Sequence, residues 1–138
     1  MATEAVPPPL PLPNLDDKPH WDGLRRHELL IQKCADCGAL RHPPRPICHA
    51  CRSGRKEWVK ASGRGVVYSY TIVPQATHPA WRDKVPYAVV IVELEEDVRL
   101  VSNLEGVPNE QIKVGLPVEI VYDDVAPDVT LPKFRVRK

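Results

Sequence analysis

Short apolar runs alternate with breaks in the second half of the chain. Five runs follow one another, GVVYSYTIV, YAVVIVEL, VRLVSNL, PVEIVY and LPKFRV, separated by glycine, proline and acidic or amide residues. β-Branched and aromatic residues dominate these runs, which is typical of strands. VPNEQIKVG, between the third and fourth runs, has room for one helical turn, as in an OB-fold. We therefore expect a mainly β chain whose residues 61–138 form a five-stranded OB-fold barrel.

The stretch 16–60 has a different pattern and predicts a short helix followed by turns and short strands. Asp17 precedes Lys18 and Pro19, as an N-cap precedes a first-turn proline, and Trp21 and Leu24 continue at helical spacing. This predicts a helix over about residues 17–27. The later sequence GALRHPPRPI contains three prolines, which exclude a helix there.

Residues 1–15 form a proline-rich tail ahead of the predicted helix. Five of the first thirteen residues are proline, a composition that favours extended polyproline II and cannot propagate a helix. Two interpretations stay open at this point. The tail is either disordered or an arm that lies along a partner.

Four cysteines form two C-x-x-C pairs separated by ten residues. Cys34 and Cys37 make the first pair, and Cys48 and Cys51 make the second. Two such knuckles facing each other complete a tetrahedral four-sulfur site, the closed geometry of structural zinc. Iron stays an alternative, because rubredoxin uses a similar cage. Four ligands leave no open position for water, so the metal is expected to support folding and not catalysis.

The residues around the cysteines refine this prediction. Gly38 follows the first pair and Ser53-Gly54 follows the second, where tight turns next to a metal need unusual backbone conformations. His42 and His49 lie within the motif, but we do not expect them to bind the metal because four better-spaced thiolates already saturate it.

Charge is distributed unevenly, although the formal net charge is only +1. Between Lys33 and Arg64 lie eight basic residues and two acidic ones, which leaves about +4 once four thiolates and one zinc ion are counted. An anionic partner fits this excess, and so does simple solvation of a small ribbon.

No apolar run approaches the roughly 20 residues of a membrane-spanning helix, and the N-terminus lacks the basic and apolar regions of a signal peptide. We expect a cytoplasmic protein, in which cysteines bind metal instead of forming disulfides.

A catalytic centre is not evident in the sequence. There is no G-x-S-x-G elbow, no H-E-x-x-H and no phosphate loop. Asp123, Asp124 and Asp128 lie in DDVAPD, which we interpret as a solvated loop. The long connection between the first two predicted strands carries His78, Trp81 and neighbouring cations, and it either has a function or covers one mouth of the barrel.

Taken together, these motifs resemble a two-part family, long catalogued as domain of unknown function number thirty-five. The matching segments are HWDGLRRHELLIQKCADCGALRHPPRPICHAC, EWVKASGRGVVYSYTIV, VPYAVVIVEL, VEIVYDD and LPKFRV. Members combine an N-terminal helix and rubredoxin-like zinc ribbon with an OB-fold. The resemblance implies an acyl-CoA-associated accessory subunit or fused domain that forms a hetero-oligomer with a thiolase-superfamily enzyme.

Such a partner would perform thiolase chemistry or, in the lipid-transfer-protein-like branch, retro-aldol cleavage of a steroid side-chain acyl-CoA. Under this resemblance the partner supplies the catalytic groups, and this chain helps to shape the channel for the CoA thioester. The candidates are Arg64, Arg82 and Lys84 for the CoA phosphates, and Trp81, Pro86 and Tyr87 for the apolar lining or the protein interface.

Other functions stay open beside this one. OB-folds and zinc ribbons also bind single-stranded nucleic acid, and Tyr68 and Tyr70 at period two would share a strand face on which bases stack. The near-neutral charge argues against that function, and so does YAVVIVELEEDVRLVSNL, which offers only Tyr87 for stacking and includes the acidic Glu93, Glu95, Glu96 and Asp97. A pure scaffold that never touches substrate is a further interpretation, and an independent acyl-CoA hydrolase is another.

Overall fold

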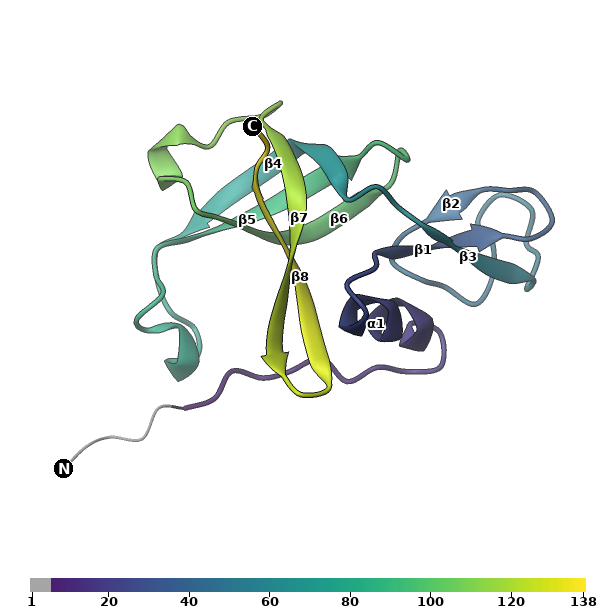
Figure 1. The fold of residues 1–138 in the computed structure, drawn as a ribbon, viewed down its shortest axis with the longest axis horizontal. Helices are drawn as coiled ribbons and strands as arrows, with labels where there is room; N and C mark the ends of the chain where they lie inside the picture. The colour runs from purple at the N-terminus through teal and green to yellow at the C-terminus, as the bar shows by residue number, and fades with distance from the viewer. Residues whose placement is uncertain (1–5) are drawn as a thin grey trace.

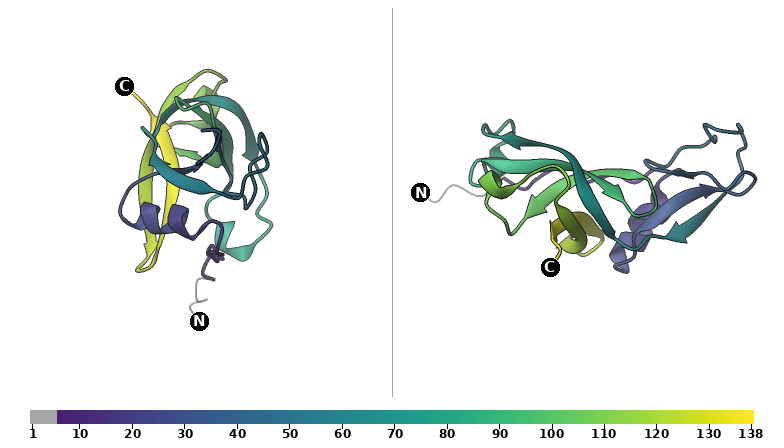
Figure 2. Two further views of the ribbon diagram at one scale, coloured as in Figure 1. Left: turned by 90° about the vertical axis from the view of Figure 1, so that its right-hand side faces the viewer. Right: turned by 90° about the horizontal axis from the view of Figure 1, so that it is seen from above.

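A short helix, a three-stranded sheet and a closed barrel follow one another along the chain (Figure 1). The structure is a computed structural model that describes residues 6–138. Its elements are α1 (Lys18–Arg25), β1 (Leu30–Cys34), β2 (Leu40–Arg41), β3 (Lys56–Lys60), β4 (Arg64–Val73), η1 (Pro79–Trp81), β5 (Tyr87–Leu94), β6 (Arg99–Glu105), η2 (Asn109–Gln111), β7 (Pro117–Ala126) and β8 (Val129–Val136). Seen from above, the three-stranded sheet of β1, β2 and β3, called the ribbon below, extends from one end of the barrel (Figure 2).

The barrel contains five strands in the order β4-β5-β6-β8-β7 and closes by antiparallel pairing of β4 with β7. Strand β5 alternates strictly between half-buried and buried positions, so one of its faces lines the interior. The short helix η2 lies between β6 and β7, where the sequence predicted a helical turn. The predicted mainly β fold with a five-stranded OB-fold barrel is confirmed.

Two glycines allow β4 to leave the ribbon and enter the barrel. Gly63 has a φ of 78°, and a side chain there would collide with Ile120. Gly65 is fully enclosed by β5, and a side chain there would overlap the backbone oxygen of Glu93. In S-G-R-G, the first glycine is therefore required by a left-handed backbone conformation and the second by the close approach of β4 to β5.

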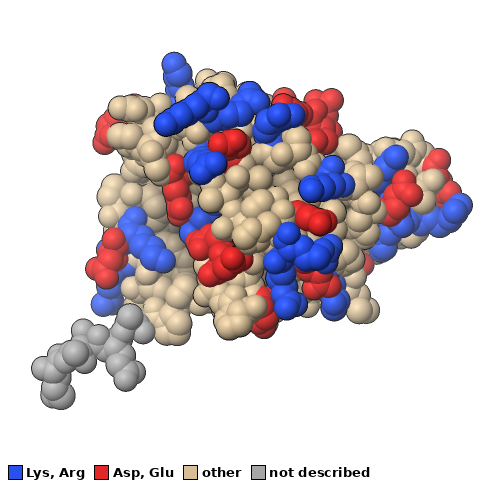
Figure 3. All heavy atoms as spheres, in the orientation of Figure 1, with Lys and Arg blue, Asp and Glu red and all other residues tan. Residues whose placement is uncertain are grey.

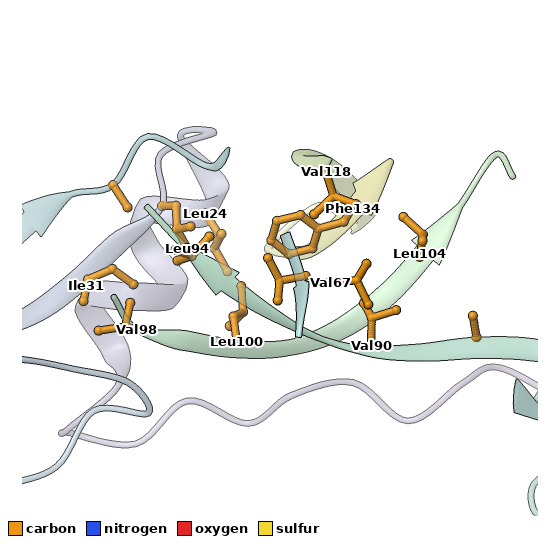
Figure 4. Close-up of a cluster of buried hydrophobic side chains, with 14 of the residues drawn as sticks. Leu24, Ile31, Val67, Val90, Leu94, Val98, Leu100, Leu104, Val118 and Phe134 are labelled. Carbon is orange, nitrogen blue, oxygen red and sulfur yellow. The ribbon is translucent and has the colours of Figure 1, made fainter. Parts of the chain in front are cut away.

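A single hydrophobic core extends from the barrel interior into the junction with the helix and ribbon (Figure 4). Phe134 of β8 is completely buried beside Val118 and Val67 inside the barrel. Leu24 of α1 and Ile31 of β1 are also completely buried and belong to the same cluster. The helix and ribbon are thus packed against the barrel and share its core.

The hairpin of β7 and β8 is longer than the sequence indicated. We expected DDVAPD to be a solvated loop, but β7 continues to Ala126. Thr130 donates a hydrogen bond to Asp124 at 2.5 Å, and His27 Nε2 lies 3.1 Å from the same carboxylate. The His27 ring also stacks on Tyr122 at 4.9 Å. Contacts with the segment after α1 therefore extend the hairpin.

The helix α1 runs over Lys18–Arg25, somewhat shorter than the predicted 17–27. Asp17 occupies the N-cap, but its carboxylate accepts a hydrogen bond from the backbone N–H of Asn14 and does not cap the helix. Within residues 6–138, no helix has the length and apolar composition needed to cross a membrane. Residues 1–5 of the predicted tail lie outside the described residues.

Candidate functional site

The four cysteine sulfurs converge at the end of the ribbon and lie within 4.8 Å of one another. The Sγ atoms of Cys34 and Cys51 are 3.5 Å apart, and those of Cys37 and Cys48 are 3.6 Å apart. Four sulfurs placed tetrahedrally at about 2.3 Å from a zinc ion would be about 3.8 Å apart. The cage therefore has the size and ligand set of a closed zinc site.

The two knuckles repeat the same backbone hydrogen bonds. The N–H of Gly38 donates to Cys34 O at 3.0 Å, and the N–H of Arg52 donates to Cys48 O at 2.9 Å. Both donors are left-handed, with φ values of 80° and 65°. The expectation for Gly38 is confirmed, but in the second knuckle Arg52, and not Ser53-Gly54, adopts the strained conformation.

Backbone N–H groups point at the sulfurs and favour their charged form. The hydrogen bond from Cys37 N–H, at 3.5 Å from the sulfur, lowers the pKa of Cys34 to about 6. The N–H groups of Cys51 and then Ala50 lower the pKa of Cys48. At Cys37 and Cys51 the backbone N–H groups are outweighed by the neighbouring sulfurs, which raise the pKa of Cys37 and raise that of Cys51 to about 12. Because a metal binds the thiolate, the backbone dipoles prepare Cys34 and Cys48 for a cation.

A second feature is a cavity of about 510 Å³ at the mouth of the barrel beside η1. Trp81, Lys84 and Tyr87, three of the residues proposed from the sequence, line it together with Pro86. The opposite side is formed by residues of β6, β7 and β8, namely Leu104, Val125, Leu131 and Lys133. The cavity thus combines apolar lining residues with two lysines, Lys84 and Lys133, and one acidic residue, Glu105.

Local hydrogen bonds order the loop that carries these residues. His78 Nδ1 accepts the backbone N–H of Ala80 at 3.1 Å and starts η1. The His78 ring meets Trp81 edge-on at 5.5 Å, and Lys84 Nζ lies 5.9 Å from the centre of the Trp81 ring. Asn109 of η2 donates to Pro86 O at 3.2 Å. The indole and the ammonium group are therefore held beside each other.

The remaining two candidates lie apart from this cavity. Arg82 is exposed on the same loop but does not line the cavity. Arg64 begins β4 and forms an ion pair with Glu95 at 3.2 Å. The loop that carries Trp81 follows Val73, at the opposite end of the ten-residue β4. Arg64 is therefore separated from this loop by the length of the strand, roughly 30 Å.

Sequence reasoning missed Lys133 as a lining residue. Its Nζ lies 2.7 Å from Asp123 and 3.1 Å from Glu105. Burial opposes its charge, but the two carboxylates outweigh burial and raise the pKa of Lys133. The only signal was its position in the terminal LPKF segment, which alone does not place it beside the Trp81 loop.

The two tyrosines considered for base stacking do not share a strand face. A bulge makes Tyr68 an extra residue of β4, and the Arg99 guanidinium covers its ring at 3.8 Å. Tyr70 lies opposite the buried Val90 and therefore faces the other side of the sheet. On the face drawn in Figure 3, basic and acidic side chains are interspersed over the barrel and the ribbon.

Comparison with known proteins adds the family. A model described as ChsH2, rubredoxin-like zinc ribbon domain, matches residues 21–57, and one described as ChsH2, C-terminal OB-fold domain, matches residues 58–123. A DUF35 domain-containing scaffold protein of Methanothermobacter thermautotrophicus is 38% identical over 102 residues, which cover 73% of this chain and 76% of that protein. The chain belongs to the DUF35 family.

Other relatives of this DUF35 chain are parts of larger enzymes. A probable enoyl-CoA hydratase alpha subunit of Thermomonospora curvata is 42% identical over 92% of this chain, which spans only 39% of that subunit. The benzoylsuccinyl-CoA thiolase subunit BbsA of Thauera aromatica is 32% identical, covering 77% of this chain and 73% of that subunit. The solved Ltp2-ChsH2(DUF35) aldolase contains a chain that matches with a TM-score of 0.85 and 41% identity, covering 91% of this chain and 98% of that one.

Proposed function

We propose that this DUF35 chain is a non-catalytic accessory subunit of a thiolase-fold enzyme that forms or cleaves a carbon–carbon bond of an acyl-CoA. Its relatives include a subunit named for a thiolase and a chain of an aldolase complex. In this proposal the partner supplies the nucleophile or base. The reducing cytoplasm, which keeps metal-binding cysteines reduced, would be the location of the complex.

The convergence of Trp81, Lys84 and Tyr87 on one cavity supports a role in substrate binding. An acyl chain is extended and apolar, and a pantetheine arm is extended with amide groups along it. Both suit a cavity lined by an indole, a phenol ring and leucines together with a few polar groups. Lys84 and the exposed Arg82 would then contact the phosphates of CoA outside the cavity. Arg64 is left out of this proposed site because it is paired with Glu95 and lies at the far end of β4.

The metal cage has a different part in the proposal. Cys34, Cys37, Cys48 and Cys51 would hold a structural zinc ion that fixes the ribbon beside α1 and the barrel. When bound, zinc supplies folding energy and no open coordination position. The ribbon and helix would then present a rigid surface to the partner enzyme.

Co-expression with the thiolase-fold protein encoded beside this chain tests the assembly. The expected result is a stable hetero-oligomer with about one zinc per chain and acyl-CoA turnover that neither protein shows alone. Assembly and turnover with no contribution of the loop to substrate affinity would favour a pure scaffold. A chain that purifies alone and retains oligonucleotides in a salt-dependent manner would refute the proposal and favour nucleic-acid binding.

A further inference from the structure

The proline-rich segment 6–13 folds back along the barrel and reaches the proposed substrate cavity. It leaves α1, runs along the lower side of the barrel as drawn in Figure 1 and ends near η1 (Figures 1 and 2). Pro8, Pro9 and Leu10 line the same cavity as Trp81 and Tyr87. These three residues thus form part of the wall of the cavity.

One end of the segment is firmly attached. The side-chain oxygen of Asn14 accepts the backbone N–H groups of Asp16 and Asp17 at 2.8 and 3.1 Å. Asp17 in return accepts the Asn14 N–H at 2.7 Å, and Lys18 N–H donates to Asn14 O at 3.0 Å. This turn fixes the direction in which the segment leaves the helix.

Beyond the turn the segment is held only weakly. Among the described residues, none from 6 to 13 forms a hydrogen bond with the barrel. Pro8 and Pro11 are half-buried while the residues between them are exposed, a spacing of three that suits the three-residue turn of polyproline II. Leu12 is 92% exposed. Displacing the segment therefore breaks no hydrogen bond of the described barrel.

We propose that residues 6–13 are a strap that closes one side of the cavity beside Trp81 and has to move aside before an acyl-CoA can bind there. Prolines restrict the free segment, so little conformational entropy is lost when the strap is seated. The competition with acyl-CoA rests on the proposed function. The seating of the strap against Trp81 does not, and the two can be tested separately.

The test compares two variants of the full chain that remove the same two residue types. Pro9→Ser/Leu10→Ser changes residues that line the cavity, and Leu12→Ser/Pro13→Ser changes exposed residues just beyond it. The chain is labelled with 5-fluorotryptophan, and Trp81→Phe assigns the Trp81 resonance. The Trp21 and Trp58 resonances report whether the rest of the fold is preserved.

The Trp81 side chain should become more exposed to solvent in Pro9→Ser/Leu10→Ser and not in Leu12→Ser/Pro13→Ser. A larger shift of its fluorine resonance between H₂O and D₂O would show this. An unchanged Trp81 resonance overturns the strap. A strap seated about nine-tenths of the time lowers the apparent affinity of a competing ligand about tenfold. Acetyl-CoA titrations should therefore show binding about tenfold tighter in Pro9→Ser/Leu10→Ser.

If the wild-type chain binds acetyl-CoA, unchanged or weaker binding in Pro9→Ser/Leu10→Ser would overturn the competition. Weaker binding would show that the segment is part of the wall of the binding site. If wild type and both variants fail to bind acetyl-CoA, alone and assembled with the partner, the proposed CoA role fails. The Trp81 measurement still decides whether the strap covers this side of the cavity.

Discussion

The imidazole rings of His20 and His42 lie 5.1 Å apart where the helix, the ribbon and the barrel meet. His20 is 3% exposed, and its Nδ1 is 3.1 Å from the carbonyl oxygen of Leu30. Within the described residues, His42 Nδ1 is buried without a hydrogen-bond partner. Burial, followed by repulsion from His20, lowers the pKa of His42 to about 4, and burial also lowers the pKa of His20. Two neutral rings therefore pack at this junction.

This pair predicts how stability depends on pH. Between about pH 4 and 6.5 the unfolded chain binds a proton at His42 that the folded chain does not. The free energy of unfolding should therefore rise with pH across this window, by up to about 3 kcal/mol for His42. Urea unfolding of the metal-saturated protein at several pH values measures it. His42→Phe should flatten the rise relative to wild type, and the exposed His49→Asn should not. An identical pH dependence in His42→Phe and wild type would contradict this account.

The two knuckles predict opposite effects of glycine. Arg52 has a φ of 65°, so Arg52→Gly should stabilise the protein by about 0.5–1 kcal/mol. Gly38→Ala should destabilise it by about 1–2 kcal/mol, because φ is 80° although the nearest atom to a new Cβ is 3.9 Å away. Denaturant unfolding at saturating zinc measures both changes. Destabilisation by Arg52→Gly would show that the arginine side chain contributes more than its backbone strain costs.

Much of the fold could be predicted from the sequence because the signals are local. The C-x-x-C spacing determines a knuckle within five residues, and alternating apolar runs mark each strand. Local patterns do not show long-range contacts. Asp124 looks like a loop residue, but it pairs with Thr130 in the β7–β8 hairpin, and its carboxylate contacts the side chains of Thr130 and His27.

The candidate site was predicted less completely for the same reason. Trp81, Lys84 and Tyr87 are close in sequence, so a single loop indicated all three. Lys133 reaches the cavity only through the closure of the barrel. The bulge at Tyr68 shifts the alternation of β4, and period two alone therefore placed Tyr68 and Tyr70 on one face incorrectly.

The metal site predicts that loss of a single thiolate is severe. Cys48→Ser should abolish metal binding and unfold the ribbon, because a structural zinc ion supplies about 10–16 kcal/mol of apparent binding energy in small domains. Elemental analysis of the purified protein should give about one zinc per chain in wild type and almost none in Cys48→Ser. His49→Ala should retain the metal. If elemental analysis finds iron instead of zinc, the four-cysteine site stands and only the identity of its metal ion changes.

The most direct test of the proposed function is the Michaelis constant of the assembled complex for the acyl-CoA that the partner turns over. Lys84→Ala removes a cation at the cavity, and Arg64→Ala removes one at the far end of β4. Loss of a charged contact to a phosphate should raise KM about three- to tenfold in Lys84→Ala with kcat unchanged, and Arg64→Ala should match wild type. Equal KM values in all three complexes would contradict a role of this chain in substrate binding and leave it a scaffold.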